Sequence, residues 1–303
     1  MGPRLFYHCG EGEPRLKKRS LSRKRRISPA VIPMYLWTIL FVAIPLIYIL
    51  GMSFMKKAET WGVVMEFSLE SYQGIFNPTY LKVFGQSLLI AFLTTCITLL
   101  LGYPFAYFTA KLPKKWRSFV LLLLIVPFWT NSLVRIYGWI ILLQGNGVIN
   151  SLLISTGLID SPLKMLYSFG AVLVGMVYAL MPFMVLTIYN SVEKLDWSVV
   201  EAARDLGAGK WKAFLTTTLP LTMPGIIAGC VLVFVPSVGL FFISDLMGGG
   251  KIMLLGNLIK NELLSAHNWP MGAALSMVMM AVTLLLIYLY KRVSGEKSLE
   301  GLL

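Results

Sequence analysis

The stretch MLYSFGAVLVGMVYALMPFMVLTIYNSV, Met165 to Val192, contains no charged side chain. A helix needs about 20 residues, at a rise of about 1.5 Å each, to cross the hydrocarbon core of a membrane. Five more stretches are long enough, and only the one at Ser118–Leu143 contains a charge, Arg135; they are Ile27–Met55, Val83–Ala110, Ser118–Leu143, Ala213–Ser244 and Leu263–Tyr290. In lipid each must satisfy its own backbone hydrogen bonds. The sequence therefore predicts an all-α membrane protein with six transmembrane helices.

The composition agrees with this fold class. Hydrophobic residues make up 57% of the 303 residues and charged ones 14%, and the mean hydropathy is +0.74. A soluble protein of this size needs more surface charge. The cysteines Cys9, Cys96 and Cys230 indicate no disulfide framework, and the first hydrophobic stretch is too long for the core of a signal peptide, so we expect it to be retained.

The net charge of +13 is distributed unevenly. Twenty of the 27 Lys and Arg fall on one side if six helices alternate, and six fall on the other. The positive-inside rule then predicts that both termini are cytoplasmic. We expect the basic tail, residues 1–30, to act as an orientation signal near anionic lipid rather than to bind nucleic acid; a nuclear localisation signal is the alternative for this tail.

The expected organisation is a basic cytoplasmic tail at 1–30, a six-helix transmembrane domain at 31–292 with a cytoplasmic loop at 193–220, and a short cytoplasmic C-terminal tail at 293–303. The polar outer turns include the glycine triplet Gly248–Gly250, and a short amphipathic helix is expected within Gln144–Asp160. The spans are expected at about Met34–Met55, Val83–Lys111, Ser118–Leu143, Phe169–Tyr189, Leu221–Ile243 and Gly272–Tyr290.

Several kinds of site are missing from the sequence. The segment around Gly209-Lys210 lacks the first glycine and the Ser or Thr of a phosphate-binding loop. His8 and His267 are the only histidines, and no Cys or His pair has metal-ligand spacing. The spans hold almost no ionisable groups, so the parts of a proton relay are also missing. We expect no catalytic residue, no metal site and no cofactor in this chain, and conclude that its energy comes from elsewhere.

The inner loop carries Glu201-Ala202-Ala203-Arg204-Asp205-Leu206-Gly207 and, further on, Leu219-Pro220. This pattern resembles the EAA motif of ABC importer permeases, except that Thr217 stands where the motif usually has isoleucine. We expect Asp196 or Ser198 to cap a helix with Glu201 in its first turn, and Gly207 to end that helix in the left-handed conformation. A second helix, Lys210–Thr218, is expected to stop at Pro220. An ordinary solvated loop is the alternative.

The resemblance extends from about Met34 to Tyr290. The segments that carry it are Leu101–Ala106, Val126–Gly138, Leu195-Asp196, Leu221–Cys230 and Ser244–Gly249. They are similar to PotB-type permeases of spermidine/putrescine ABC importers. The resemblance implies the type I ABC importer permease fold and the bacterial inner membrane. It implies as partners a second, PotC-type permease, two PotA-type ATPase subunits that bind ATP and Mg²⁺, and a PotD-type substrate-binding protein. It also implies that Ala202, Ala203, Asp205, Gly207, Leu219 and Pro220 serve ATPase coupling, and that Glu201 pairs with a basic residue of the ATPase.

A polyamine is a flexible polycation, so its path should offer carboxylates and aromatic faces. Asp245, at the outer end of the fifth span, is the strongest candidate to attract an ammonium group, with Phe241, Phe242 and Ser244 before it. The alternative is that Asp245 pairs with Arg135, which we expect about 25 Å into the third span, where it can reach the outer interface. Trp129, Asn131 and Tyr137 on the third span are further path candidates. For the two aromatic residues among them, a place in the aromatic belt at the membrane interface is the alternative role. Glu59, Glu66 and Glu70 either contact the binding protein or solvate a loop.

The expected function is alternating access driven by ATP hydrolysis on the ATPase pair. A permease for another cationic or small organic substrate is the nearest alternative, since coupling motifs do not report cargo. An ion-coupled secondary transporter would need paired repeats with intramembrane charges. A receptor or purely structural membrane protein would leave the EAA spacing unexplained.

Overall fold

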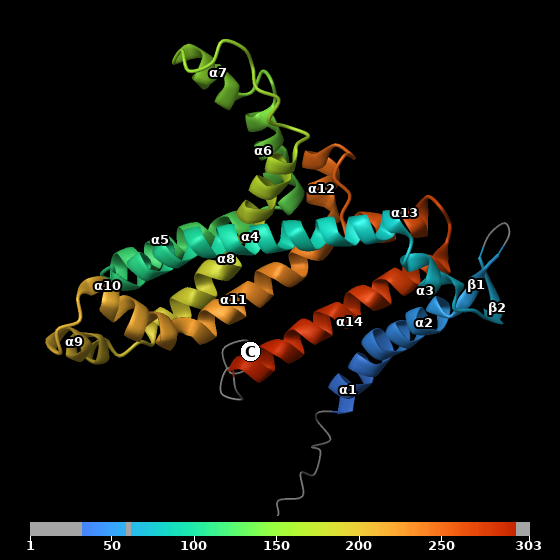
Figure 1. Ribbon diagram of the computed structural model, residues 1–303, viewed down its shortest axis with the longest axis horizontal. Coiled ribbons are helices and arrows are strands. Elements are labelled where there is room, and N and C mark those ends of the chain that lie inside the picture. The colour runs from blue at the N-terminus through green and yellow to red at the C-terminus, as the bar shows by residue number, and fades with distance from the viewer. Residues whose placement is uncertain (1–31, 59–61, 295–303) are drawn as a thin grey trace, which may run out of the picture. The chain divides into compact units, whose positions relative to one another are not determined.

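The computed structural model describes residues 32–58 and 62–294, and the expected tail at 1–30, most of the tail at 293–303 and Glu59 lie outside these residues. Within the described ranges six helical segments are long and apolar enough to cross a membrane, as predicted. They are Ile32–Ser53, Pro78–Lys111, Ser132–Ser155, Phe169–Glu193, Lys210–Gly239 and Trp269–Leu289. The protein is therefore an all-α membrane protein (Figure 1).

The chain forms two compact units, which divide after Leu46. The described part of the first unit consists of helix α1 (Ile32–Thr38), the π-helix η2 (Ile39–Ala43) and the start of α2 (Ile44–Ser53). In this unit the Trp37 and Phe41 rings lie 4.2 Å apart, one helical turn from each other.

A small hairpin follows α2. Strands β1 (Met55–Lys57) and β2 (Val63–Phe67) pair antiparallel, with Met55 opposite Phe67. The Phe67 ring stacks on Phe54 at 5.7 Å between centroids. The short helix α3 (Glu70–Ile75) comes next, and its Tyr72 hydroxyl lies 2.8 Å from the Ser53 hydroxyl. Of the glutamates expected to contact a binding protein or to solvate a loop, Glu66 lies on β2 and Glu70 begins α3.

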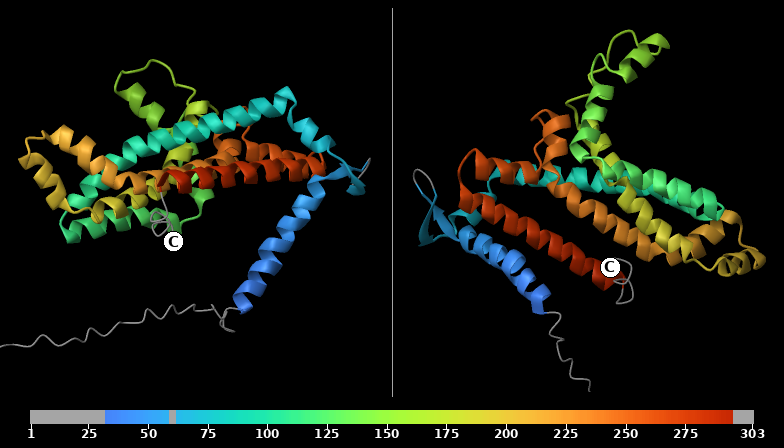
Figure 2. Two further views of the ribbon diagram at one scale, coloured as in Figure 1. Left: turned by 60° about the horizontal axis from the view of Figure 1, so that its bottom comes forward. Right: turned by 180° about the vertical axis from the view of Figure 1, so that it is seen from behind.

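Three long helices form the core of the second unit. These are α4 (Pro78–Lys111), α8 (Phe169–Glu193) and α11 (Leu219–Gly239), which pack against one another. Figure 1 and the two views of Figure 2 show the three helices side by side. Met184, Val185 and Ile188 of α8 are completely buried in this packing. The centre of α8 is buried because neighbouring helices cover most of its circumference, which agrees with its uninterrupted apolar sequence.

Small residues let α8 and α11 approach closely. Gly225 and Gly229 lie four residues apart on α11, the spacing that brings two glycines to one face of a transmembrane helix. A Cβ atom at Gly225 would lie 2.7 Å from the backbone oxygen of Thr187, and one at Gly229 would lie 2.7 Å from the Met184 sulfur. The backbones can therefore pack at this distance only without side chains at these two positions.

The third span is not the single helix that was expected over Ser118–Leu143. The chain there forms α5 (Lys114–Ile125), a 3-10 turn η3 (Val126–Trp129) and α6 (Ser132–Leu143). The spanning segment Ser132–Ser155 begins with α6 and includes the expected short helix, α7 (Val148–Ser155). Thr130 is extended, and the Asn131 side chain accepts a hydrogen bond from the Leu133 N–H at 2.8 Å, which starts a new helix. Pro127 lacks the N–H that would continue α5. Figure 1 shows α5 alongside α4 and α6 turning away from it.

The helix expected to stop at Pro220 continues through it. Helix α10 (Lys210–Ala213) leads through the π-helix η4 (Phe214–Thr218) directly into α11. The Leu219 N–H donates to the Phe214 carbonyl, five residues back. This widened turn precedes the proline ring and gives it room in the position where an α-helix would clash with it. The prediction of a helix end at Pro220 was therefore wrong.

The fifth span ends earlier than expected, at Gly239. Leu240 (φ −72°, ψ 68°) leaves the helical conformation, and a separate helix α12 (Phe241–Gly248) follows. The expected glycine turn is present, with φ values of +58° at Gly249 and +75° at Gly250. An unexpected helix α13 (Leu255–Leu264) then precedes the last span, α14 (Trp269–Ser294).

Candidate functional site

The loop expected on the cytoplasmic side, residues 193–220, contains a helix, α9 (Trp197–Asp205), with the expected cap at Asp196. The Asp196 carboxylate accepts a hydrogen bond from the Ser198 N–H at 3.0 Å. The Ser198 side chain and this N–H bond together hold the pKa of Asp196 below its ordinary value. The cap is therefore ionised at neutral pH and is lost only as the pH falls through that lowered value. Because Asp196 and not Ser198 is the cap, the helix starts at Trp197 and Glu201 lies in its second turn. The expected interaction of Glu201 with the helix dipole in the first turn is therefore wrong.

Gly207 ends α9 as predicted. Its φ is +88°, in the left-handed region. The Gly207 N–H donates to the Arg204 carbonyl at 2.9 Å, and the Ala208 N–H donates to the Ala203 carbonyl at 3.2 Å. These two bonds make a Schellman motif, which satisfies the last carbonyls of the helix.

Helix α9 is exposed to solvent on the face that points away from the rest of the chain. It has no buried residue, and Leu206 beside it is 90% exposed, although leucine is ordinarily covered. We call the exposed set the coupling surface; it comprises Glu201, Ala202, Asp205, Leu206 and Trp211. Ala203 is half-buried, and Leu219 and Pro220 lie at the start of α11, where Leu219 packs against the core and Pro220 is exposed.

Aromatic contacts hold this loop against the end of α4. The Tyr107 ring lies 6.0 Å from both the Trp197 and Phe214 rings. The Lys111 ammonium lies over Tyr107 at 4.3 Å and over Trp197 at 4.9 Å. Such contacts hold a helix pair at a defined position relative to a span.

A polar cavity of about 300 Å³ lies between α9, η4 and the end of α4. Glu201 lines it together with three cations, Lys111, Arg204 and Lys210. Among the described residues Glu201 forms no ion pair. Its carboxylate is therefore available to a partner, whereas the salt bridge nearby joins Arg117 to Glu193 at 3.1 Å.

The path candidate Asp245 lies on α12, and its partner in the structure is Lys260 and not Arg135. Asp245 pairs with Lys260 of α13 at 2.5 Å, and its other oxygen accepts from the Asn257 side-chain amide at 2.5 Å. No ion pair joins Asp245 to Arg135. The alternative pairing with Arg135 was therefore wrong, since it assumed that both residues lay on long continuous spans.

The other candidates near Asp245 differ in their accessibility. Phe241 is 39% exposed, whereas Phe242 packs against a buried cluster that includes Ile243. Ser244 is completely buried, and its hydroxyl donates to the Ile252 carbonyl. Of these three, Phe241 is exposed, Phe242 is half-buried and Ser244 is buried.

Arg135 packs against aromatic rings instead of reaching outward. Its guanidinium lies 4.5 Å from the Phe128 ring centroid and 5.9 Å from that of Tyr178. Its Nε atom is buried and has no hydrogen-bond partner in the part of the chain that the structure describes. The expected reach to the outer interface depended on one continuous helix from Ser118, and the break at Thr130 removes that basis. Trp129 and Tyr137 are exposed, at 82% and 53%, and Asn131 caps α6.

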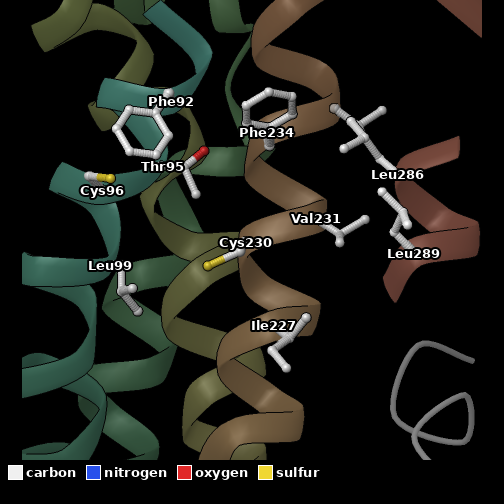
Figure 3. A pocket seen from close by; sticks show the side chains of 11 residues that line it. Phe92, Thr95, Cys96, Leu99, Ile227, Cys230, Val231, Phe234, Leu286 and Leu289 are labelled. Atoms are coloured by element: carbon white, nitrogen blue, oxygen red, sulfur yellow. The ribbon is translucent and has the colours of Figure 1, made fainter. Parts of the chain in front are cut away.

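A second, apolar cavity of about 450 Å³ lies between α4, α11 and α14. Figure 3 shows its lining, in which Phe92, Leu99, Phe234 and Leu286 surround the thiols of Cys96 and Cys230. The one hydroxyl there, that of Thr95, donates to the Ala91 carbonyl. A cation would lose its hydration in this cavity without a counter-charge, so the cavity is unsuited to an ammonium group.

Sequence reasoning missed Lys260 and Asn257. Both lie on α13, a segment that was treated as part of an outer turn and the last span. The spacing of Asn257, Lys260 and Asn261 in an otherwise apolar run is compatible with one helical face. That weak pattern was the only local signal for them.

The chain is similar in sequence to known components of transport systems. Residues 99–296 match the family described as binding-protein-dependent transport system inner membrane component. The chain is 49% identical over 258 residues to the spermidine/putrescine transport system permease protein PotB of Escherichia coli K12, covering 85% of this chain and 94% of that protein. It is 44% identical to PotB of Haemophilus influenzae over 268 residues, covering 88% and 93%.

Solved structures share the fold. A bacterial ABC transporter involved in import of the acidic polysaccharide alginate superposes with a TM-score of 0.70 at 17% identity, covering 88% of this chain and 95% of the other. The bacterial alginate transporter in complex with its alginate pentasaccharide-bound periplasmic protein gives 0.72 at 16% identity, covering 89% and 93%.

Proposed function

The chain belongs to the family of binding-protein-dependent transport system inner membrane components, and we propose that it passes spermidine and putrescine across the bacterial inner membrane as the permease subunit of an ABC importer. The observation that carries the cargo is the 49% identity to a spermidine/putrescine permease over 85% of the chain. The six spanning helices and the exposed inner helix α9 supply the structural parts of such a permease. The chain itself is a non-catalytic subunit of the importer.

The coupling surface is proposed to dock on a separate ATPase that binds ATP and Mg²⁺. Support comes from three features of the loop: α9 is exposed on its outer face, Glu201 has no ion pair among the described residues, and the Schellman motif at Gly207 fixes the direction of the chain after the helix. Two ATPase copies, a second permease and a binding protein would complete the importer. Closure of the ATPase pair on ATP would move α9 and, through the aromatic contacts of Tyr107, the end of α4.

The substrate path is proposed to pass Asp245. Its carboxylate supplies a counter-charge for an ammonium group, and the exposed Phe241 beside it supplies an aromatic face. Trp129 and Tyr137, both exposed, are further candidates to line the path, whereas Asn131 and Arg135 are engaged in a helix cap and in ring contacts.

Uptake of labelled spermidine and putrescine in a strain that lacks the chain tests the cargo directly. We expect uptake to return when the chain is restored and to stop when ATP is depleted with the ion gradient intact. Uptake that continues without ATP would establish an ion-coupled transporter instead. No recovery of uptake for either polyamine would overturn the polyamine assignment and favour another cationic or small organic substrate.

The coupling role is tested by Glu201→Gln, which removes the charge and keeps the shape. We expect uptake to fall at least tenfold and the ATPase to be lost on co-purification, since a charged pair at a docking surface loses its attraction when one partner becomes neutral. Glu193→Gln is the matched control, because it neutralises a nearby carboxylate whose partner, Arg117, is in this chain. Equal effects of the two changes would contradict the assignment of Glu201.

A further inference from the structure

The Asp245 carboxylate is held in place by a buried amide rather than by its lysine partner. Asn257 is 3% exposed, and its side-chain amide donates to both Asp245 and the Phe241 carbonyl, the latter at 3.1 Å. Its oxygen accepts from the Leu254 N–H at 2.9 Å. The two bonds from the amide nitrogen tie α13 to α12, and the bond from Leu254 fixes the Asn257 side chain at the start of α13, so the orientation of the carboxylate is set before any cation binds.

Lys260 is the replaceable member of this group. Its side chain is 31% exposed and that of Asp245 is 37% exposed, so water reaches both partners of the ion pair. An ion pair exposed to this extent contributes little net stability, because the lysine loses side-chain entropy and both charges are partly hydrated. A second ammonium group can therefore compete with Lys260 for Asp245 at little cost.

The surroundings of the Lys260 ammonium have the chemistry of a site for a primary amine. The ammonium contacts one carboxylate oxygen and lies 5.6 Å from the centroid of the Phe241 ring, which is 39% exposed. A carboxylate and an aromatic face are the two groups that recognise alkylammonium ions. Lys260 is itself an alkylammonium, on a four-carbon stem. The chain thus carries an internal equivalent of one end of a polyamine.

We propose that Lys260 occupies a substrate ammonium subsite formed by Asp245 and Phe241, and that a polyamine displaces it during passage. This inference rests on the proposed polyamine function. While the path is empty, Lys260 neutralises Asp245. When a substrate amine arrives it exchanges with the lysine ammonium, so Lys260 weakens binding at this subsite and favours release.

Differential acylation of lysines measures the exchange. The importer is assembled with its partner subunits in lipid nanodiscs, treated briefly with an amine-acylating reagent with and without millimolar spermidine, and analysed by peptide mass spectrometry. We expect spermidine to raise the acylation rate of Lys260 at least threefold, because a lysine amine displaced from its carboxylate partner is more accessible to the reagent. Lys251 is exposed on the turn between α12 and α13 and forms no ion pair within residues 32–58 and 62–294, so it is the internal control and its acylation rate should not change.

Uptake by two variants completes the test. Lys260→Met should lower the half-saturating spermidine concentration at least threefold, since it leaves the subsite open while Asn257 still holds Asp245. Lys251→Met should leave that concentration unchanged. If the pair were only structural, Lys260→Met would reduce the amount of folded importer and leave the half-saturating concentration as it was.

The outcomes separate this inference from the function on which it rests. Normal spermidine uptake, with Lys260 acylation insensitive to spermidine and an unchanged half-saturating concentration in Lys260→Met, overturns the subsite and leaves the polyamine function standing. Absence of spermidine uptake in the unmodified importer overturns both.

Discussion

Gly207 carries a prediction that depends on backbone conformation alone. Its φ is +88°, yet a Cβ built there would meet no atom within 4 Å. Gly207→Ala therefore costs only the left-handed strain of a non-glycine residue, about 1–2 kcal/mol. We expect this to loosen the end of α9 and to lower ATP-driven uptake about five- to thirtyfold, as measured in vesicles with equal amounts of importer.

A glycine two residues away supplies the control. Gly209 also has open space around its Cβ position, but its φ is −60°, which any residue adopts. Gly209→Ala should keep uptake within twofold of the unmodified protein. The uptake of Gly207→Asn should lie between those of Gly207→Ala and Gly209→Ala, because asparagine tolerates the left-handed region better than alanine. A loss in Gly209→Ala as large as that in Gly207→Ala would show that added bulk, and not φ, is responsible.

The residues whose roles could be predicted are those that interact with near neighbours along the chain. Asp196 and Gly207 were identified as cap and terminator because helix ends are satisfied by neighbours in the chain. The Asp245–Lys260 pair was not foreseen, because it joins residues 15 positions apart across a turn whose second helix gave little signal. Arg135 was misplaced for a similar reason: the aromatic partner Tyr178 lies on another helix.

Among the elements, the contact of α8 with α11 depends on the missing side chain at Gly225. A Cβ there would lie 2.7 Å from the Thr187 backbone oxygen and 2.6 Å from the Ser191 Cβ, and a backbone atom cannot move aside alone. We expect Gly225→Ala to destabilise the folded chain by about 1–3 kcal/mol, the usual cost of overpacking. Thermal aggregation of the purified importer in detergent should then begin several degrees lower.

Gly85 of α4 is the matched control for that change. It is also a glycine within a spanning helix, but its Cβ position is open. Gly85→Ala should leave the aggregation temperature unchanged or raise it slightly, because alanine favours helix more than glycine does. If both variants aggregated at the same lowered temperature, close packing of α8 on α11 would not be the cause.

The existence of the spanning elements was predictable, but their interruptions were not. The hydropathy of a span is the sum of the transfer free energies of about 20 side chains, so a single proline hardly changes it. Whether a proline ends a helix depends on whether neighbouring groups satisfy the backbone hydrogen-bonding groups that the proline leaves unpaired. Pro127 precedes a break at Thr130, whereas Pro220 sits in a continuous helix because the π-helix η4 comes before it. The sequence around the two prolines did not distinguish these outcomes.

For the whole molecule, the distribution of charge predicts an orientation that can be measured. Six spans place both termini on one side, and the excess of Lys and Arg assigns that side to the cytoplasm. The loop that carries Leu206 then faces the cytoplasm, and the hairpin that carries Met65 faces outward. These two side chains are 90% and 91% exposed, so a reagent confined to one side should distinguish them by location alone.

Single cysteines at these positions test the orientation. Cys9, Cys96 and Cys230 are first replaced by serine, and then Met65→Cys or Leu206→Cys is introduced. In intact spheroplasts a membrane-impermeant maleimide should label Met65→Cys and not Leu206→Cys, and it should label both after permeabilisation. Labelling of Leu206→Cys in intact spheroplasts would place α9 on the outer side. A cytoplasmic ATPase could not reach the coupling surface there, so this result would contradict the coupling proposal as well as the orientation.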